Sequence, residues 1–122
     1  DFIMEINELV KKAHENAVNH GFWNPTPAFG TSIALIHSEL SEALEEEREG
    51  NPDFWFKEVN GFKVSDMNEW RGEKPEGVAV ELADAVIRIA DLCGHLGIDL
   101  DAAIREKMAY NEGRPYKHGK KF

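Results

Sequence analysis

The stretch "VELADAVIRIAD" at residues 80–91 is apolar around almost the whole circumference of a helix, yet it carries Glu81 and Asp84 three residues apart. At about 100° per residue, these two acids share one stripe with Arg88 and Asp91. The apolar remainder consists of Val78, Leu82, Ala85, Val86, Ile89, Ala90, Leu92 and Leu96. We therefore expect a helix buried on several sides, whose acidic stripe faces protein or a partly enclosed cleft with a positive charge nearby.

Hydrophobic periodicity predicts helices over residues 2–20, 28–49, 75–97 and 99–113, the third of which contains the quoted stretch. Pro75 is suited to a helix start and Asp99 to an N-cap. The four helices predict an all-α fold, a four-helix bundle-type protomer formed by a single domain over residues 1–122.

The segment 51–75 mixes aromatic, charged and turn-forming residues and predicts a long loop. Within it, "EVNGFKV" at residues 58–64 has the Asn-Gly centre of a tight hairpin. Trp55 and Trp70 either belong to a lid or anchor this loop, and we favour the anchor.

Composition limits the possible partners. The chain has 14 basic and 23 acidic residues, a net charge of −9, which argues against a general nucleic-acid binder. The single Cys93 excludes an intramolecular disulfide and a cysteine-based zinc site, and it favours a reducing compartment. No apolar run approaches the roughly 20 residues of a membrane span, and no signal-peptide pattern is present. We expect a cytoplasmic protein that binds neither membranes nor nucleic acid.

A second acidic pair lies in "SELSEALEEE" at residues 38–47, where Glu39 and Glu42 are three apart and Glu46 follows on the same side. Two facing helices with such pairs would bring four carboxylates together, as in the metal sites of helical bundles. Oxygen ligands alone favour Mg²⁺, with Mn²⁺ as a substitute, over zinc. The missing Glu-x-x-His motif disfavours a di-iron centre. Outside this group, we expect Glu45, Glu47 and Glu49 on a solvated face.

The fourth helix carries Lys107, Asn111 and Arg114, which are spaced by four and three residues along one side. They are suited to hold an anion bound at the metals. Alternatively, Lys107 and Arg114 pair with the surplus acids.

Three motifs in order resemble the all-α NTP pyrophosphatases, a superfamily that includes MazG-like proteins, dimeric dUTPases, dCTP pyrophosphatases and phosphoribosyl-ATP pyrophosphatases. They are "ELSE" at 39–42, "ELAD" at 81–84 and "KMAYNEGRP" at 107–115, and the likeness extends from "GFW" at 21–23 to Pro115. The chain is most similar to the MazG-like branch, of which "KPEGVAVELADAVIRIADL" at 74–92 is typical. The aromatic insertion at 51–75 departs from the family pattern.

The resemblance implies hydrolysis of a nucleoside triphosphate to the monophosphate and pyrophosphate, by water attack at the α-phosphorus with Mg²⁺. It implies that the metal ligands are Glu39, Glu42, Glu81 and Asp84, one of which, or Glu46, accepts the proton of the water.

For the substrate, the resemblance implies that Lys107, Asn111 and Arg114 hold phosphate or sugar, with Lys107 offsetting charge in the transition state. Trp23 is a candidate for stacking on the base, assisted by His20 or Phe22. The alternative is that Phe22 and Trp23 cover the end of the bundle. The remaining histidines, which show no ligand spacing and are expected to be structural or exposed, are His14, His37, His95 and His118.

A chain this short with carboxylates inside its bundle is expected to complete its core and active site by forming a homo-oligomer, a dimer or a tetramer. Two alternatives to a MazG-like enzyme stay open. One is a dUTPase-like or phosphoribosyl-ATP pyrophosphatase-like member of the superfamily, and the other is a helical module that binds metal or a partner without catalysis.

Overall fold

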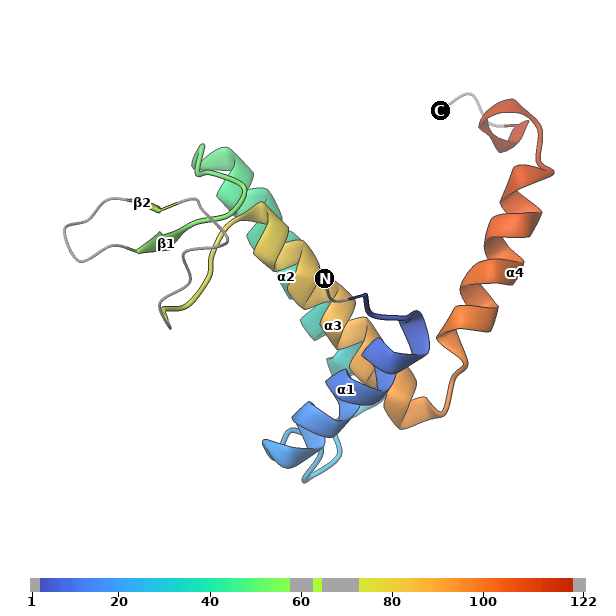
Figure 1. The fold of residues 1–122 in the computed structure, drawn as a ribbon, viewed down its shortest axis with the longest axis horizontal. Helices are drawn as coiled ribbons and strands as arrows, with labels where there is room; N and C mark the ends of the chain where they lie inside the picture. Colours follow the sequence, from blue (N-terminus) through green and yellow to red (C-terminus); the bar gives the residue numbers. More distant parts are fainter. Residues whose placement is uncertain (1–2, 58–62, 65–72, 120–122) are drawn as a thin grey trace.

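The computed structural model describes residues 3–57, 63–64 and 73–119, and its α-helices follow the predicted order (Figure 1). The helices are α1 (Ile6–Asn19), α2 (Phe29–Arg48), α3 (Val78–Leu96) and α4 (Leu100–Glu112), followed by a 3-10 turn, η2 (Tyr116–Gly119). The predicted all-α class is confirmed. Among the helices of these residues, none combines the length and the apolar character needed to cross a membrane.

Helix α3 lies at the centre and packs against α2 on one side and α1 on another (Figure 1). The contact with α1 buries Val10 and Ala13 against Ala90 and Cys93. Gly94 permits this close approach, because a Cβ atom there would lie 2.5 Å from the Cβ of His14. Small side chains on the facing sides therefore bring the two helix backbones close together.

Helix α4 turns away from the other three helices (Figure 1) and has no buried residue. Its start is held on α1, since the Asn7 side-chain amide donates to Asp99 Oδ1 at 3.0 Å and Asn7 Oδ1 accepts from the Asp101 N–H at 3.1 Å. Asp99 also accepts from the N–H of Ala102, which confirms the predicted N-cap. Within one chain, α1, α2 and α3 thus pack together while α4 leaves their group.

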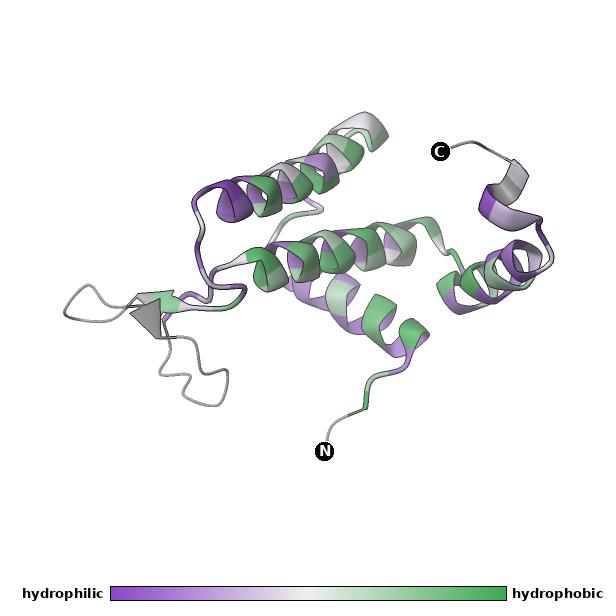
Figure 2. Cartoon of the chain, turned by 90° about the horizontal axis from the view of Figure 1, so that it is seen from above, coloured by the Kyte–Doolittle hydropathy of each residue, from purple (hydrophilic) through white to green (hydrophobic). Residues whose placement is uncertain are grey.

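The expectation that α3 is buried on several sides is wrong for the isolated chain. Leu82 and Val86 are 47% and 51% exposed, and Ile89 and Leu96 are also exposed. Leu40 and Leu44 of α2 are exposed as well, and Figure 2 shows hydrophobic residues on the turns of both helices. The reason is that, among the described residues, α1 and α2 provide most of the contacts with α3 and leave part of its apolar circumference exposed.

The loop after α2 contains the predicted hairpin. Strand β1 (Phe56–Lys57) pairs antiparallel with β2 (Lys63–Val64). Trp55 is 7% exposed, and its indole N–H donates to Glu46 Oε2 at 3.3 Å, so its role as an anchor is confirmed. Asn60 and Gly61, the predicted centre of the hairpin turn, and Trp70 lie outside the described residues.

The predicted start of the third helix at Pro75 is three residues too early, because the chain remains extended through Glu76. The backbones of Trp55 and Glu76 exchange two hydrogen bonds, of 2.9 and 2.8 Å, and α3 begins only after Gly77. Gly77 has φ +112°, and a Cβ atom there would lie 2.2 Å from the carbonyl oxygen of Asp53. Only glycine fits this junction.

We therefore predict that Gly77→Ala lowers the free energy of unfolding by about 1–3 kcal/mol, through backbone strain and the clash with Asp53. Urea unfolding followed by circular dichroism measures the change. The matched control is Gly30→Ala in α2, where a Cβ atom meets nothing within 4 Å. Equal stability of the two variants would contradict this account of the junction.

Candidate functional site

Three of the four predicted ligands come together where α2 faces α3. Glu39 of α2 joins Glu81 and Asp84 of α3, and one carboxylate oxygen from each lies within 4.8 Å of the other two. Glu39 and Glu81 are buried, and Asp84 is half-buried. Glu42, the fourth predicted ligand, is exposed, but it lies near enough to affect the ionisation of Glu81. We call these four residues the acidic cluster.

Small residues one turn after two of the glutamates explain how the helices approach. Ala43 follows Glu39 by four residues and Ala85 follows Glu81 by four, and both alanines are buried. Residues four apart lie on the same helix face. Each helix thus presents a glutamate and an alanine side by side, and the short alanine leaves room for the facing carboxylates. The sequence shows this repeated Glu-x-x-x-Ala spacing, but hydrophobic periodicity alone does not distinguish these alanines from other apolar residues.

The compensating positive charge is Arg88. The Nε of Arg88 donates to Glu39 Oε1 at 2.9 Å, and the positive charge of Arg88 acts to lower the pKa of Asp84. Arg88 lies four residues after Asp84 on the acidic stripe of α3, so the sequence already placed it on the correct side. The charge of Lys74 also lowers the pKa of Asp84, more weakly than that of Arg88.

Glu81 is the least compensated member of the acidic cluster. Its Oε2 is the one buried side-chain oxygen or nitrogen of the described residues without a hydrogen-bond partner. Burial raises the pKa of Glu81 from an ordinary 4.5 to about 8. Hydrogen bonding with Glu42 and then Glu39, and the negative charges of Glu42 and Asp84, add to the rise. A proton shared among the carboxyl groups, or a bound cation, would compensate the negative charge of the buried Glu81 carboxylate.

Asp84 has a raised pKa as well. Burial is the largest cause, the negative charge of Glu39 is the next, and the charge of Arg88 acts in the opposite direction. Two neighbouring carboxyl groups are thus held toward their protonated forms. A divalent cation would displace those protons, so cation binding at the acidic cluster must strengthen as pH rises.

A pocket of about 370 Å³ begins at this cluster and extends between α1, α2 and α3. Glu39, Asp84 and Arg88 line it together with Phe22 and Trp23 from the turn after α1. An acidic region and an aromatic wall therefore border the same space.

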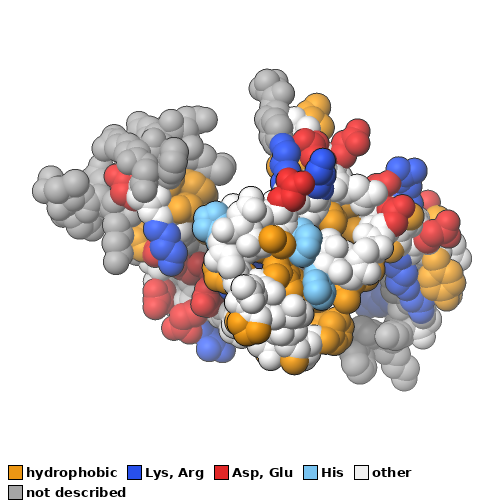
Figure 3. Space-filling view, turned by 90° about the horizontal axis from the view of Figure 1, so that it is seen from below, with side chains coloured by type: hydrophobic (Ala, Val, Ile, Leu, Met, Phe, Trp, Pro, Cys, Tyr) orange, Lys and Arg blue, Asp and Glu red, His pale blue; other side chains and the backbone are white. Residues whose placement is uncertain are grey.

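Trp23 is held in place by a hydrogen bond from its indole N–H and by stacking of its ring. Its indole N–H donates to Asp91 Oδ1 at 2.8 Å, and its ring stacks on His95 with centroids 4.0 Å apart. Asp91 also bonds to Nδ1 of His14 at 2.9 Å. Histidine side chains group together among hydrophobic ones on the face in Figure 3. The sequence placed Asp91 on the acidic stripe, but nothing in it indicated that Asp91 orients Trp23.

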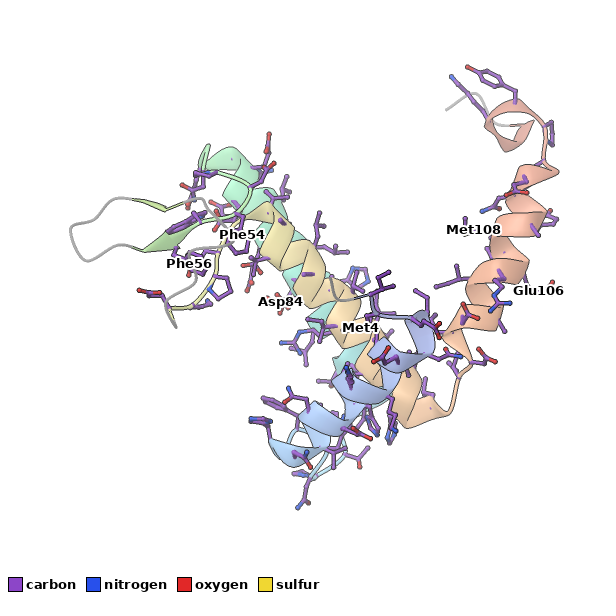
Figure 4. All side chains as sticks on the ribbon, in the orientation of Figure 1. Met4, Phe54, Phe56, Asp84, Glu106 and Met108 are labelled. Atoms are coloured by element: carbon purple, nitrogen blue, oxygen red, sulfur yellow. The ribbon has the colours of Figure 1, made fainter. Side chains whose placement is uncertain are left out.

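The residues predicted to bind phosphate lie elsewhere. Lys107 and Asn111 belong to α4 and Arg114 follows it, while Figure 4 shows Met108 of α4 remote from Asp84. The Lys107 ammonium and the Arg114 guanidinium lie over the Tyr110 ring, at 4.9 and 5.4 Å from its centroid. One chain does not bring these three residues to the acidic cluster.

The other predicted acids have different environments. Glu46 accepts hydrogen bonds from Asn51 at 2.7 Å and from Trp55, so it supports the loop anchor. Glu45, Glu47 and Glu49 are exposed, as expected of a solvated face. His20 and His37 are exposed, and His20 contacts the carbonyl of Asn16.

No protein-family model, curated protein or solved structure matches the chain.

The raised pKa of Glu81 predicts a pH-dependent stability in metal-free buffer. The folded chain keeps the proton of Glu81 up to about pH 8, whereas the unfolded chain releases it near 4.5. Between these values the folded state binds more protons, so the free energy of unfolding falls as pH rises. Glu81→Gln, which supplies a permanent N–H donor, should flatten this fall and raise the melting temperature at pH 8. Thermal unfolding of both proteins from pH 5 to 9 with a chelator tests it.

Glu45→Gln is the control, because it removes an exposed glutamate from the same region and should keep the wild-type slope. If Glu81→Gln melts below wild type at every pH, the buried carboxylate is instead a stabilising structural group.

Proposed function

We propose that the chain is a Mg²⁺-dependent nucleoside triphosphate pyrophosphohydrolase that converts a (d)NTP to the monophosphate and pyrophosphate. The observation that carries this proposal is the buried, unpartnered Oε2 of Glu81 within carboxylates from two helices. The ordered "ELSE", "ELAD" and "KMAYNEGRP" motifs support it.

The donor set suits the proposed cofactor. Glu39, Glu81 and Asp84 offer only carboxylate oxygens, and no histidine or cysteine joins them in the described chain. Hard oxygen ligands favour Mg²⁺ or Mn²⁺ over zinc. Glu42 is near enough to serve as a further ligand, and its exposed position leaves it open to water.

Bound Mg²⁺ would neutralise phosphate charge and lower the pKa of the attacking water. The chain contributes the fixed positions of the carboxylates and a partly buried site that limits the access of bulk water. Among the acids proposed as proton acceptor, Glu42 is the most accessible, whereas the carboxylate of Glu46 is engaged by Asn51 and Trp55. We therefore favour Glu42 over Glu46 in this role.

The pocket beside the acidic cluster provides the place for the nucleoside. Arg88 lines it close to the acids, where its guanidinium is suited to bind a phosphate oxygen. Trp23 lines it further along and is fixed by Asp91 and His95. A rigid aromatic ring is a suitable contact for a planar base.

We further propose that the active form is a cytoplasmic homo-oligomer, a dimer or a tetramer. Support comes from the exposed side chains of Leu40, Leu44, Leu82 and Val86, an apolar surface that a soluble enzyme would cover by association. The same surface favours the second candidate function, a helical module that binds metal or a partner without catalysis.

A panel of standard and damaged nucleotides, assayed for pyrophosphate release with Mg²⁺ and with Mn²⁺, tests the proposal. We expect monophosphate and pyrophosphate as products, and no reaction in a chelator. Preference for dUTP or for phosphoribosyl-ATP would assign the chain to the corresponding branch of the superfamily. No release from any nucleotide by the intact protein would favour the module without catalysis.

Replacing one of the proposed metal-binding carboxylates by an amide should stop hydrolysis of the nucleotide and leave the fold intact. We predict that Asp84→Asn and Glu42→Gln each lower kcat by about 100-fold or more, because a neutral amide binds the cation weakly. Helicity by circular dichroism should be unchanged. Glu47→Gln is the control, since it removes an exposed acid from the same helix as Glu42 and should keep full activity. Wild-type rates in Asp84→Asn would refute the site.

A further inference from the structure

Arg88 borders both the acidic cluster and the pocket. On the polar stripe of α3 it follows Asp84 by four residues and precedes Asp91 by three, so the three side chains share one face of the helix. All three line the pocket, together with Glu39 from α2. The guanidinium therefore lies between the carboxyl groups proposed to bind a metal ion and the space proposed for the nucleotide.

The guanidinium is bonded to one of the proposed metal ligands. Arg88 Nε donates to Glu39 Oε1 at 2.9 Å, and the Glu39 side chain is only 9% exposed. Glu39 also supplies a carboxylate oxygen to the group that includes Glu81 and Asp84. Little water screens an ion pair of which one member is buried. Arg88 thus supplies positive charge at the place where a divalent cation is proposed to bind.

The positive charge of Arg88 also reaches Asp84. Burial and the charge of Glu39 raise the pKa of Asp84, and the charge of Arg88 opposes this rise more strongly than that of Lys74, which is 81% exposed and pairs with Glu76. A charge that acts on Asp84 in this way also repels a divalent cation that approaches it. At a pH where the carboxyl groups are ionised, protons no longer compete and the repulsion remains.

The terminal nitrogens of the same guanidinium are open to an anion. The hydrogen bond to Glu39 uses Nε, and neither terminal nitrogen of Arg88 donates to another residue within the described ranges. The Arg88 side chain is 42% exposed and lines the pocket. The planar guanidinium matches the geometry of phosphate oxygens. A triphosphate beside the cluster is therefore attracted by the charge that repels a free metal ion.

We propose that Arg88 makes the acidic cluster selective for a metal ion bound to a nucleoside triphosphate over the free metal ion. This inference rests on the proposed function and deepens it by naming the form in which the substrate binds. Arg88 lowers the affinity for the free ion through its charge at Glu39 and Asp84. Its terminal nitrogens bind phosphate oxygens of the complex, so that one guanidinium couples the binding of the cation to that of the phosphates.

Calorimetric titration of the full chain measures this selectivity. Free Mg²⁺ and the preformed complex of Mg²⁺ with inorganic triphosphate are titrated at about pH 9, above the raised pKa of Glu81. In Arg88→Gln, the affinity for free Mg²⁺ should rise about 10-fold, because a repelling charge is lost. The affinity for the complex should fall about 10-fold, because charge-assisted hydrogen bonds are lost. The ratio of the two affinities therefore changes by about 100-fold.

Two further variants separate a general effect of charge from the specific position of Arg88. Arg48→Gln removes an exposed arginine nine residues after Glu39 on α2, and both affinities should stay within about twofold of wild type because solvent screens this charge. Arg88→Lys keeps the charge and loses the planar guanidinium. Its affinity for free Mg²⁺ should equal that of wild type, while the triphosphate complex binds more weakly.

Arg88→Gln leaves Glu39 without its cationic partner, so thermal unfolding checks that the variant folds. Where the variant is unstable without metal, its melting temperature is followed as Mg²⁺ is added, since a ligand that binds the folded state stabilises it. The rise in melting temperature should begin at a Mg²⁺ concentration about 10-fold lower than for wild type.

The results distinguish this selectivity from the proposed function. An unchanged or weaker affinity of Arg88→Gln for free Mg²⁺ overturns the repulsion, even where the wild type hydrolyses a nucleotide. An unchanged affinity of the same variant for the triphosphate complex overturns the contact with phosphate. The expected change in both affinities, without hydrolysis of any nucleotide by the wild type, keeps the selectivity and overturns the proposed function.

Discussion

The structure depends on the burial of the Glu81 carboxyl group between α2 and α3. The Oε2 atom of this carboxyl group is buried and has no hydrogen-bond partner among the described residues, and burial raises the pKa of Glu81 to about 8, which favours the protonated form below that pH. The repeated Glu-x-x-x-Ala spacing brings the helices close enough for this to happen, and Arg88 balances one of the surrounding charges. The carboxyl groups are therefore held together against their mutual repulsion by the packing of the helices.

This arrangement connects the acidic cluster to its surroundings. Toward the pocket, Asp84 and Arg88 share a wall with Trp23, whose orientation depends on Asp91 from the same stripe of α3. Beyond the cluster, Glu46 supports Trp55, which pairs with Glu76 just before α3 begins. One side of α3 thus provides both the acids Glu81 and Asp84 and the hydrogen bond from Asp91 to the aromatic wall, which explains why its polar residues recur every three or four positions.

Periodicity predicted the helices well because it depends on neighbours along the chain. The N-cap Asp99 and the side of α3 on which Arg88 lies were predicted correctly for the same reason, and three of the four predicted acids, Glu39, Glu81 and Asp84, come together. The start of α3 was wrong by three residues, because the strand-like pairing of Trp55 with Glu76 is a contact between distant segments. The burial of Leu82 and Val86 was wrong because an apolar pattern shows that a surface needs cover and not which chain provides it. The function of Asp91 could not be predicted, since it depends on where Trp23 lies.

The two hydrogen bonds made by Asn7 have a geometric consequence for the position of the far end of α4. The helix contains 13 residues and is about 20 Å long. A change of about 10° at its start would move its far end by about 3 Å, roughly the length of a hydrogen bond. The hydrogen bonds of Asn7, near the beginning of α1, therefore help to determine where the far end of α4 lies. Substitutions at Asn7 are therefore expected to shift the far end of α4, although this residue belongs to α1.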